Sequence, residues 1–209
     1  MAHWLDNFRG RLERYVATMA TPEAYQADVA WAVDKHKLAK QLLAPEAILA
    51  ASQRELYDAL KQVCLNIEAL PFRATRIADA NETDRLRNGL YKLISTKGTA
   101  ADKMRAAAIR QFGEATLTEL LCLYAPQRFV MKNRPTMAGL AKLCELYPES
   151  HLRDMAYAEF GDLVREMEKE HRAALLAKLP MEDFYLQHKC LLICLFLARH
   201  AGKGKRPYG

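Results

Sequence analysis

Apolar residues recur three and four positions apart along most of this 209-residue sequence, and proline or glycine interrupts the pattern mainly between segments. This spacing puts the apolar side chains on one face of an α-helix, where they can pack on a shared core. Nine glycines and eight prolines are too few turn-forming residues for a sandwich or barrel of many short strands. We therefore predict an all-α protein, a compact domain of about eight or nine helices.

The ends of the expected helices follow from residues that cap or break a helix. Thr21-Pro22 and Ala44-Pro45 each open a helix, because proline fits the first turn, and Thr83 is expected to cap another. Residues 128–131 are expected to be extended. Eight of the expected helices cover about 4–19, 23–43, 46–70, 83–94, 116–124, 136–147, 150–179 and 182–199. A ninth is expected after the break at Lys97-Gly98-Thr99, carries Met104, Ala108, Ile109 and Phe112, and stops at Gly113.

The domain organisation depends on one stretch, residues 72–81, which shows no helical period and is the best candidate for a linker. A composition of 51% hydrophobic and 27% charged residues is typical of a globular protein and excludes extended disorder as the main content. We expect one all-α unit over 1–201, with 1–71 and 82–201 as possible halves. A basic flexible tail follows over 202–209.

The cysteines and the N-terminus predict a cytoplasmic protein. The five cysteines form no repeated CxxC spacing and lie in apolar helical stretches, so we expect buried free thiols and no disulfide. The N-terminus carries charges every few residues, unlike a signal peptide. The longest apolar run, 190–198, is far shorter than the roughly 20 residues that cross a bilayer, so no membrane partner is expected.

Positive charge is concentrated in one part of the chain. The formal net charge is +6, and residues 71–113 hold nine Lys/Arg against four acidic residues. Arg85 and Lys92 lie seven positions apart and face away from the apolar stripe, and Lys103 and Arg110 are expected to do the same. Such a cluster suits a phosphate backbone, although an ordinary solvated helix surface is the open alternative. The cations expected to hold phosphates are Arg73, Arg76, Arg85, Lys92, Lys97, Lys103 and Arg110.

The segment Ile109–Leu143 has a distinctive layout of helix, glycine, small-residue helix, proline, extended segment and helix. Its marker residues are Gly113, Thr118, Leu121, Pro126, Phe129-Val130-Met131, Asn133, Leu140 and Leu143. This layout resembles helical segments of prokaryotic restriction and phage-defence proteins, including relatives of modified-cytosine restriction proteins. It is more distantly similar to the helix-hairpin-helix region of base-excision DNA glycosylases.

The resemblance implies that backbone amides near Gly113 face a phosphate, together with Lys132, Asn133 and Arg134. The alternative is that Gly113 stops a helix and Asn133 caps one. Asn133 stands where such glycosylases place an aspartate, and an amide cannot act as a carboxylate base. The catalytic lysine of the glycosylase hairpin has no counterpart here, so we predict no catalytic residue.

Other chemical signatures are weak. The six histidines form no pair with zinc-site spacing, and Glu168-x-x-His171 is half of a di-iron motif, which we expect to lie at the surface. No nucleotide-binding glycine pattern or Gly-x-Ser-x-Gly occurs, so neither a metal nor a cofactor is predicted. Four acidic residues form a stripe that we expect to be solvated: Glu159, Asp162, Glu166 and Glu170.

These observations favour a non-enzymatic protein that binds nucleic acid, with DNA as the predicted partner. The resemblance suggests a subunit or accessory factor of a prokaryotic defence or restriction-type system, in contact with other subunits of a larger complex. Two alternatives remain open. One is a helical adaptor or scaffold that binds other proteins, and the other is a glycosylase-like DNA repair enzyme.

Overall fold

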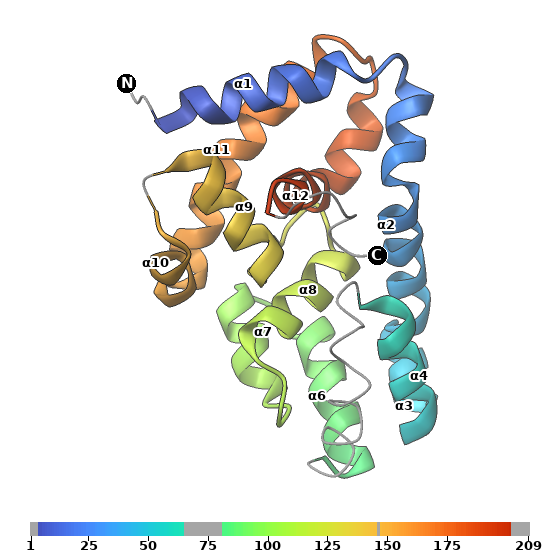
Figure 1. Cartoon of the computed structure of the whole chain (residues 1–209). Coiled ribbons are helices and arrows are strands. Elements are labelled where there is room, and N and C mark those ends of the chain that lie inside the picture. The colour runs from blue at the N-terminus through green and yellow to red at the C-terminus, as the bar shows by residue number, and fades with distance from the viewer. Residues whose placement is uncertain (1–3, 65–80, 146, 202–209) are drawn as a thin grey trace.

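The computed structural model describes residues 4–64, 81–145 and 147–201, and every regular element in this part of the chain is an α-helix (Figure 1). The all-α prediction is therefore confirmed. The described residues form eleven helices, slightly more than expected. The helices are α1 (Trp4–Ala17), α2 (Pro22–Leu42), α3 (Pro45–Ala50), α4 (Gln53–Val63), α6 (Thr83–Ser95), α7 (Ala100–Ala107), α8 (Glu114–Tyr124), α9 (Arg134–Cys144), α10 (Glu149–Asp154), α11 (Tyr157–Leu176) and α12 (Glu182–Arg199).

Several helix ends lie where local signals predict them. Thr21 caps α2 by accepting a hydrogen bond from the Ala24 amide at 3.2 Å, and Pro22 is the first helical residue. Helix α12 has the predicted bounds. Thr83 does not cap α6 but is its first residue, and Glu82 precedes it without a side-chain cap.

The expected helix over 46–70 is wrong, because the chain breaks between α3 and α4. Ala51 has an extended backbone, and Ser52 starts α4 with a capping box. Its hydroxyl accepts from the Glu55 amide at 3.3 Å, while the Glu55 carboxylate accepts from the Ser52 amide at 2.7 Å. Residues 65–70, and all of the expected linker except Asn81, lie outside the described residues.

The expected helix over 150–179 is also broken, between α10 and α11, where Met155 and Ala156 are extended. The Lys132 ammonium donates to the carbonyls of Arg153 (3.0 Å) and Met155 (2.5 Å) at this break. A side chain from a distant segment therefore stabilises the break between α10 and α11, which no local pattern indicates.

Helix α7 also ends earlier than expected, because Ala108 adopts a left-handed conformation with φ 44°.

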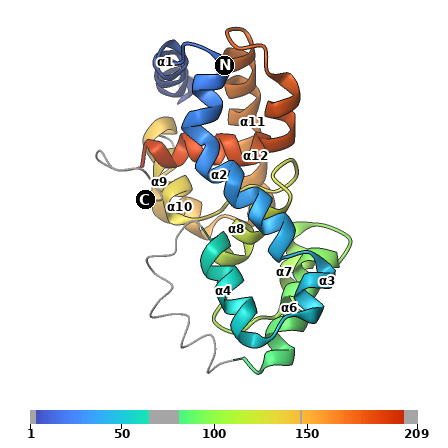
Figure 2. The same cartoon turned by 90° about the vertical axis from the view of Figure 1, so that its right-hand side faces the viewer.

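The core is one cluster of buried apolar residues that draws on the long helices of both halves of the chain. Helix α12 lies among α1, α2, α9 and α11 in Figure 1, and its residues 190–198 are all buried. Helix α2 runs from the end of the molecule formed by α1 and α11 to the end formed by α3 and α4 (Figure 2). A Cβ atom on Gly139 would lie 1.8 Å from the Leu197 carbonyl oxygen, so α9 and α12 touch backbone to backbone there.

The cysteine prediction is confirmed, because all five thiols are free and buried. They belong to the packed interior as small apolar side chains: Cys64, Cys122, Cys144, Cys190 and Cys194. Burial raises the pKa of each thiol for which a shift is resolved, and that of Cys144 reaches about 12. Among the described helices, none combines the length and apolar character needed to cross a bilayer.

Candidate functional site

The predicted phosphate-binding residues divide into an exposed group and a buried group. Five of the described ones are exposed: Arg85, Lys92, Lys97, Arg110 and Arg134. Arg134 lies 3.7 Å from Glu149, a long ion pair at the protein surface. Arg73 and Arg76 lie outside the described residues.

The prediction that Lys103 points outward is wrong. Only 5% of the residue is exposed, and its ammonium donates to the carbonyls of Ile94 (2.9 Å) and Leu93 (3.4 Å) near the end of α6. Burial lowers its pKa, and the nearby Arg128 lowers it further. Ala100 and Ala107, three positions before and four after Lys103, are buried too and mark the helix face that packs inward. Lys103 therefore joins α6 to α7.

Lys132 is also turned inward rather than toward solvent. Its ammonium donates to Glu114 Oε2 at 2.7 Å as well as to the two carbonyls at the α10–α11 break. A lysine ammonium has three protons, so these three acceptors use its full donor capacity. Lys132 therefore is not part of a phosphate-facing surface.

Asn133 caps α9, which confirms the alternative that this residue is a helix cap. Its side-chain oxygen accepts from the Thr136 amide at 3.2 Å and its amide nitrogen donates to Glu119 Oε2 at 3.2 Å. The residue is 1% exposed. Gly113 precedes the first residue of α8 rather than ending the helix before it. The side chain of Asn133 is thus structural and inaccessible to a phosphate.

Four of the exposed cations lie on α6 or next to its ends, and we call them the basic α6 surface: Arg85, Lys92, Lys97 and Arg110. Arg85 and Lys92 are two turns apart on one face, about 10 Å along the axis. Lys97 follows the end of α6. Arg110 lies by its start, because Asn81 both donates to the Arg110 carbonyl and accepts from the Arg110 amide, each at 3.0 Å.

The basic α6 surface forms no ion pair with a described acidic residue. Residues 81–113 hold seven Lys/Arg and three acidic residues. Two of these three carboxylates pair with cations outside the surface, Asp84 with Arg87 at 2.9 Å and Asp102 with Arg105 at 3.6 Å. The positive charge of the surface is therefore largely uncompensated by its own neighbours.

Many exposed cations on other helices, unlike those of the basic α6 surface, lie against a carboxylate. Four pairs at 2.5–3.1 Å illustrate this: Arg9–Glu170, Lys37–Asp34, Arg165–Asp162 and Lys169–Glu166. Three of these four carboxylates belong to the acidic stripe of α11. Pairs of this kind at a surface contribute little stability, but they do neutralise charge locally.

Glu168 and His171 are buried between α11 and α12, so the expectation that they lie at the surface is wrong. The Tyr185 hydroxyl lies 2.8 Å from His171 Nδ1, and the Arg172 guanidinium lies 3.7 Å from the Glu168 carboxylate. Burial lowers the pKa of His171 to about 3, so the ring is neutral. Within the described part of the chain, no group of three or more His, Cys, Asp or Glu side chains is arranged to hold a metal ion.

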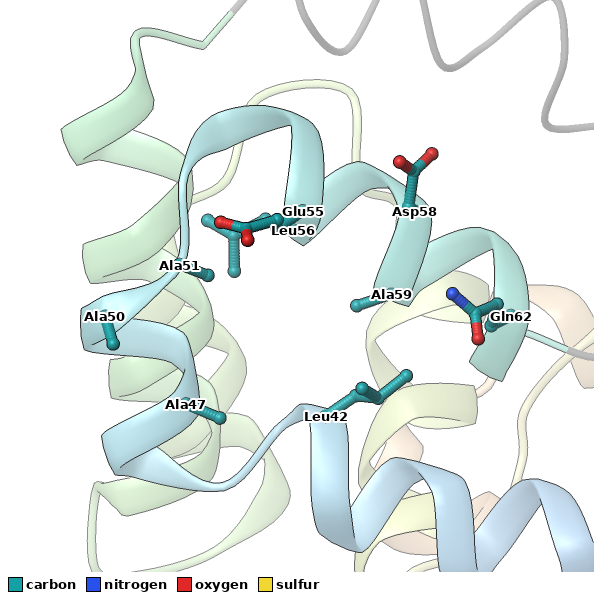
Figure 3. Close-up of a pocket in the computed structure, with 9 residues that line it drawn as sticks. All are labelled: Leu42, Ala47, Ala50, Ala51, Glu55, Leu56, Asp58, Ala59 and Gln62. Atoms are coloured by element: carbon teal, nitrogen blue, oxygen red, sulfur yellow. The ribbon is translucent and has the colours of Figure 1, made fainter.

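A hollow of about 390 Å³ lies between α2, α3 and α4 (Figure 3). Its lining is mainly apolar, from Leu42, Ala47 and Leu56 among others, with Glu55 and Asp58 as its acidic residues. Glu55 is engaged in the capping box, and Asp58 lies 3.4 Å from Lys61. Both carboxylates thus have structural partners, and the hollow presents no catalytic pair.

Comparison with known proteins gave no match: no family model fits the chain, and neither a curated protein nor a solved structure is significantly similar to it.

Proposed function

We propose that this chain is a non-enzymatic nucleic-acid-binding protein that holds the phosphate backbone of DNA on its basic α6 surface. The observation that carries the proposal is the set of four exposed cations, two on α6 and one next to each of its ends, that form no ion pair with a described acidic residue. Cations that are already exposed and unpaired contact phosphates without first breaking an internal ion pair.

The physical basis of such binding is counterion release. Each phosphate neutralised by lysine or arginine frees condensed cations, which favours binding and makes it fall steeply with salt. Contacts of this kind carry no sequence information, so we expect affinity for duplex DNA without a preferred sequence. A role as a subunit of a prokaryotic defence system stays a proposal that rests on the resemblance of Ile109–Leu143, and a cytoplasmic location stays a prediction.

The adaptor alternative predicts a large exposed apolar patch. Among the described residues, the large hydrophobic side chains classed as exposed are Leu49 (49%) and Leu186 (37%), which belong to α3 and α12. The glycosylase alternative needs a carboxylate and a lysine free to meet a substrate. Lys132 and Asn133, which that resemblance implicates, are engaged in structural hydrogen bonds. Both observations favour the nucleic-acid proposal.

The test is fluorescence anisotropy of a labelled 20-base-pair duplex with the full chain and two variants of equal net charge. In the α6 variant, glutamine replaces all four cations of the basic α6 surface. In the control, glutamine replaces four cations that are ion-paired elsewhere: Arg9, Lys37, Arg165 and Lys169.

We expect the α6 variant to lose duplex binding by about a hundredfold or more at 50 mM salt, because several phosphate contacts are removed together. The control removes the same charge from positions outside the surface, so its affinity should change by less than about threefold. Equal losses in both variants would show that net charge alone attracts DNA and would contradict the proposed site. Single-stranded DNA and duplex RNA of the same length measure the preference among nucleic acids.

A further inference from the structure

A second concentration of cations surrounds a pocket beside α1. Helix α1 lies at the end of the molecule away from α6 (Figure 1). The pocket has a volume of about 390 Å³ and lies where α1, the end of α9 and the end of α12 meet. Its polar lining consists of Asn7, Arg11, Lys142, Glu145, Arg199 and His200. We call it the α1–α12 pocket.

Three cations from three helices line this pocket. Arg11 and Lys142 are exposed and form no ion pair with a described acidic residue. Arg199 is held in place by Asp28 of α2 at 2.6 Å and by the Tyr15 ring, whose centroid is 5.1 Å away. The pocket therefore combines one fixed guanidinium with two cations that are free to meet a ligand.

The acidic residue in the lining is Glu145, which accepts a hydrogen bond from the Asn7 side chain at 3.2 Å. Asn7 also donates to the Lys142 carbonyl at 3.2 Å. The lining thus has three positive charges against one negative charge when His200 is neutral, and Asp28 offsets part of the charge of Arg199. A positive excess remains, which favours an anion.

His200 adds a donor that depends on pH. Its Nδ1 lies 2.8 Å from the Phe196 carbonyl oxygen, which can only accept, so Nδ1 carries a proton and Nε2 is the nitrogen that titrates. Burial lowers the pKa of His200, and Arg11, Arg199 and Lys142 lower it further. An anion that offsets these three cations would favour the protonated ring, which then offers a new N–H donor.

We propose that the α1–α12 pocket binds a multiply charged phosphate group, a phosphomonoester or pyrophosphate, with Arg11 and Lys142 as direct partners and protonated His200 as a further donor. Several donors that converge from different helices suit an anion with several charged oxygens better than a single carboxylate. The volume leaves room for a small organic group attached to the phosphate. The site is separate from the basic α6 surface and does not depend on it.

The test is an NMR titration of the histidine Cε1–H resonances of the full chain against pH, with sodium pyrophosphate, inorganic phosphate, or sodium chloride at matched ionic strength. H200Q assigns the His200 resonance. His36 and His188, which pack edge to face at another site, serve as internal controls. We expect pyrophosphate to raise the pKa of His200 and leave the pKa values of the two control histidines unchanged, with tighter binding at pH 6 than at pH 8.

The double variant R11Q/K142Q separates a direct role from a general charge effect. Without ligand, its His200 pKa should rise, because two cations that lower it are gone. Its affinity for pyrophosphate should fall about tenfold or more, as expected when charged hydrogen bonds are lost. K37Q/K169Q, which removes two paired cations elsewhere, should bind as the wild type does.

A His200 pKa that responds to pyrophosphate no more than to chloride overturns the proposal, as does unchanged binding in R11Q/K142Q. Competition by a DNA duplex identifies the source of the phosphate. Retention of pyrophosphate in the presence of the duplex supports a free phosphate compound as the ligand, whereas its displacement would show that the pocket takes the singly charged phosphodiesters of a nucleic-acid backbone and would overturn the proposed phosphomonoester or pyrophosphate ligand. The α6 variant should bind pyrophosphate normally, so the two sites can fail independently.

Discussion

Replacing Lys132 by methionine tests whether this lysine is structural or faces a ligand. Methionine keeps much of the volume but removes an ammonium that donates to Glu114 and to the carbonyls of Arg153 and Met155. Each hydrogen bond to a charged group contributes about 1.5–3 kcal/mol, and an unsatisfied buried carbonyl costs about 1–3 kcal/mol. Glu114 is partly exposed, so water can solvate it again.

The two carbonyls account for most of the expected loss, about 3 kcal/mol in the free energy of unfolding. For a chain of this length that corresponds to a fall of about 6–12 °C in Tm. Thermal unfolding followed by circular dichroism measures it, and anisotropy measures DNA affinity below the transition. K132M should be less stable with unchanged affinity. K92M is the matched comparison, because Lys92 is exposed on α6, and it should lose affinity with a stability change under about 0.5 kcal/mol. The reverse pattern would refute the reasoning.

Three further perturbations test the fold. Gly139→Ala should destabilise the protein by about 2–3 kcal/mol in urea unfolding, because its Cβ would meet the Leu197 carbonyl, whereas Gly10→Ala, which meets no atom within 4 Å, should be neutral or stabilising. Ser52→Ala should cost about 1 kcal/mol by removing the cap of α4. The wild-type protein should lose about 2 kcal/mol in its free energy of unfolding between pH 7 and pH 5 because of His171, and His171→Leu should not show this loss. The unfolded state protonates this histidine near pH 6.5, whereas the folded state holds it neutral down to about pH 3.

Each of these expectations has a clear contrary result. Equal stability of the two alanine variants would mean that α9 and α12 are not in backbone contact at Gly139. An unchanged Ser52→Ala protein would argue against the break between α3 and α4. The sign of the histidine effect is fixed, because a group whose folded pKa is depressed makes the unfolded state bind more protons as pH falls. The same pH dependence in wild type and His171→Leu would therefore contradict the burial of this ring.

Local sequence signals were sufficient for the helices whose ends depend on their own residues. Thr21 and Pro22 start α2, and the bounds of α12 agree with its apolar run and flanking charges. The break between α10 and α11 could not be predicted in this way, because its carbonyls are satisfied by Lys132, about twenty residues earlier in the chain. Asn81 similarly holds the segment after α7 by bonding both backbone groups of Arg110.

In the candidate sites, too, local sequence patterns predict some residues correctly, whereas others depend on contacts between distant parts of the chain. Arg85 and Lys92 are exposed because they oppose the buried Leu86 and Leu90 on a regular helix, as the pattern predicts. Lys103 lies on a stripe of buried alanines, a signal that was present but is weak, because alanine is common on any helix face. The cations of the α1–α12 pocket come from residues 11, 142 and 199, so only the packing of three helices brings them together.

The most direct test of the central claim is the salt dependence of duplex DNA binding by the wild-type chain, measured by anisotropy from 50 to 200 mM potassium chloride. Four phosphate contacts predict a log–log slope of about −3 to −4 for the binding constant. The α6 variant should have a slope near zero wherever its binding is measurable. A wild-type slope no steeper than that of the α6 variant, or no duplex binding at 50 mM salt, would contradict the claim that the basic α6 surface binds nucleic acid.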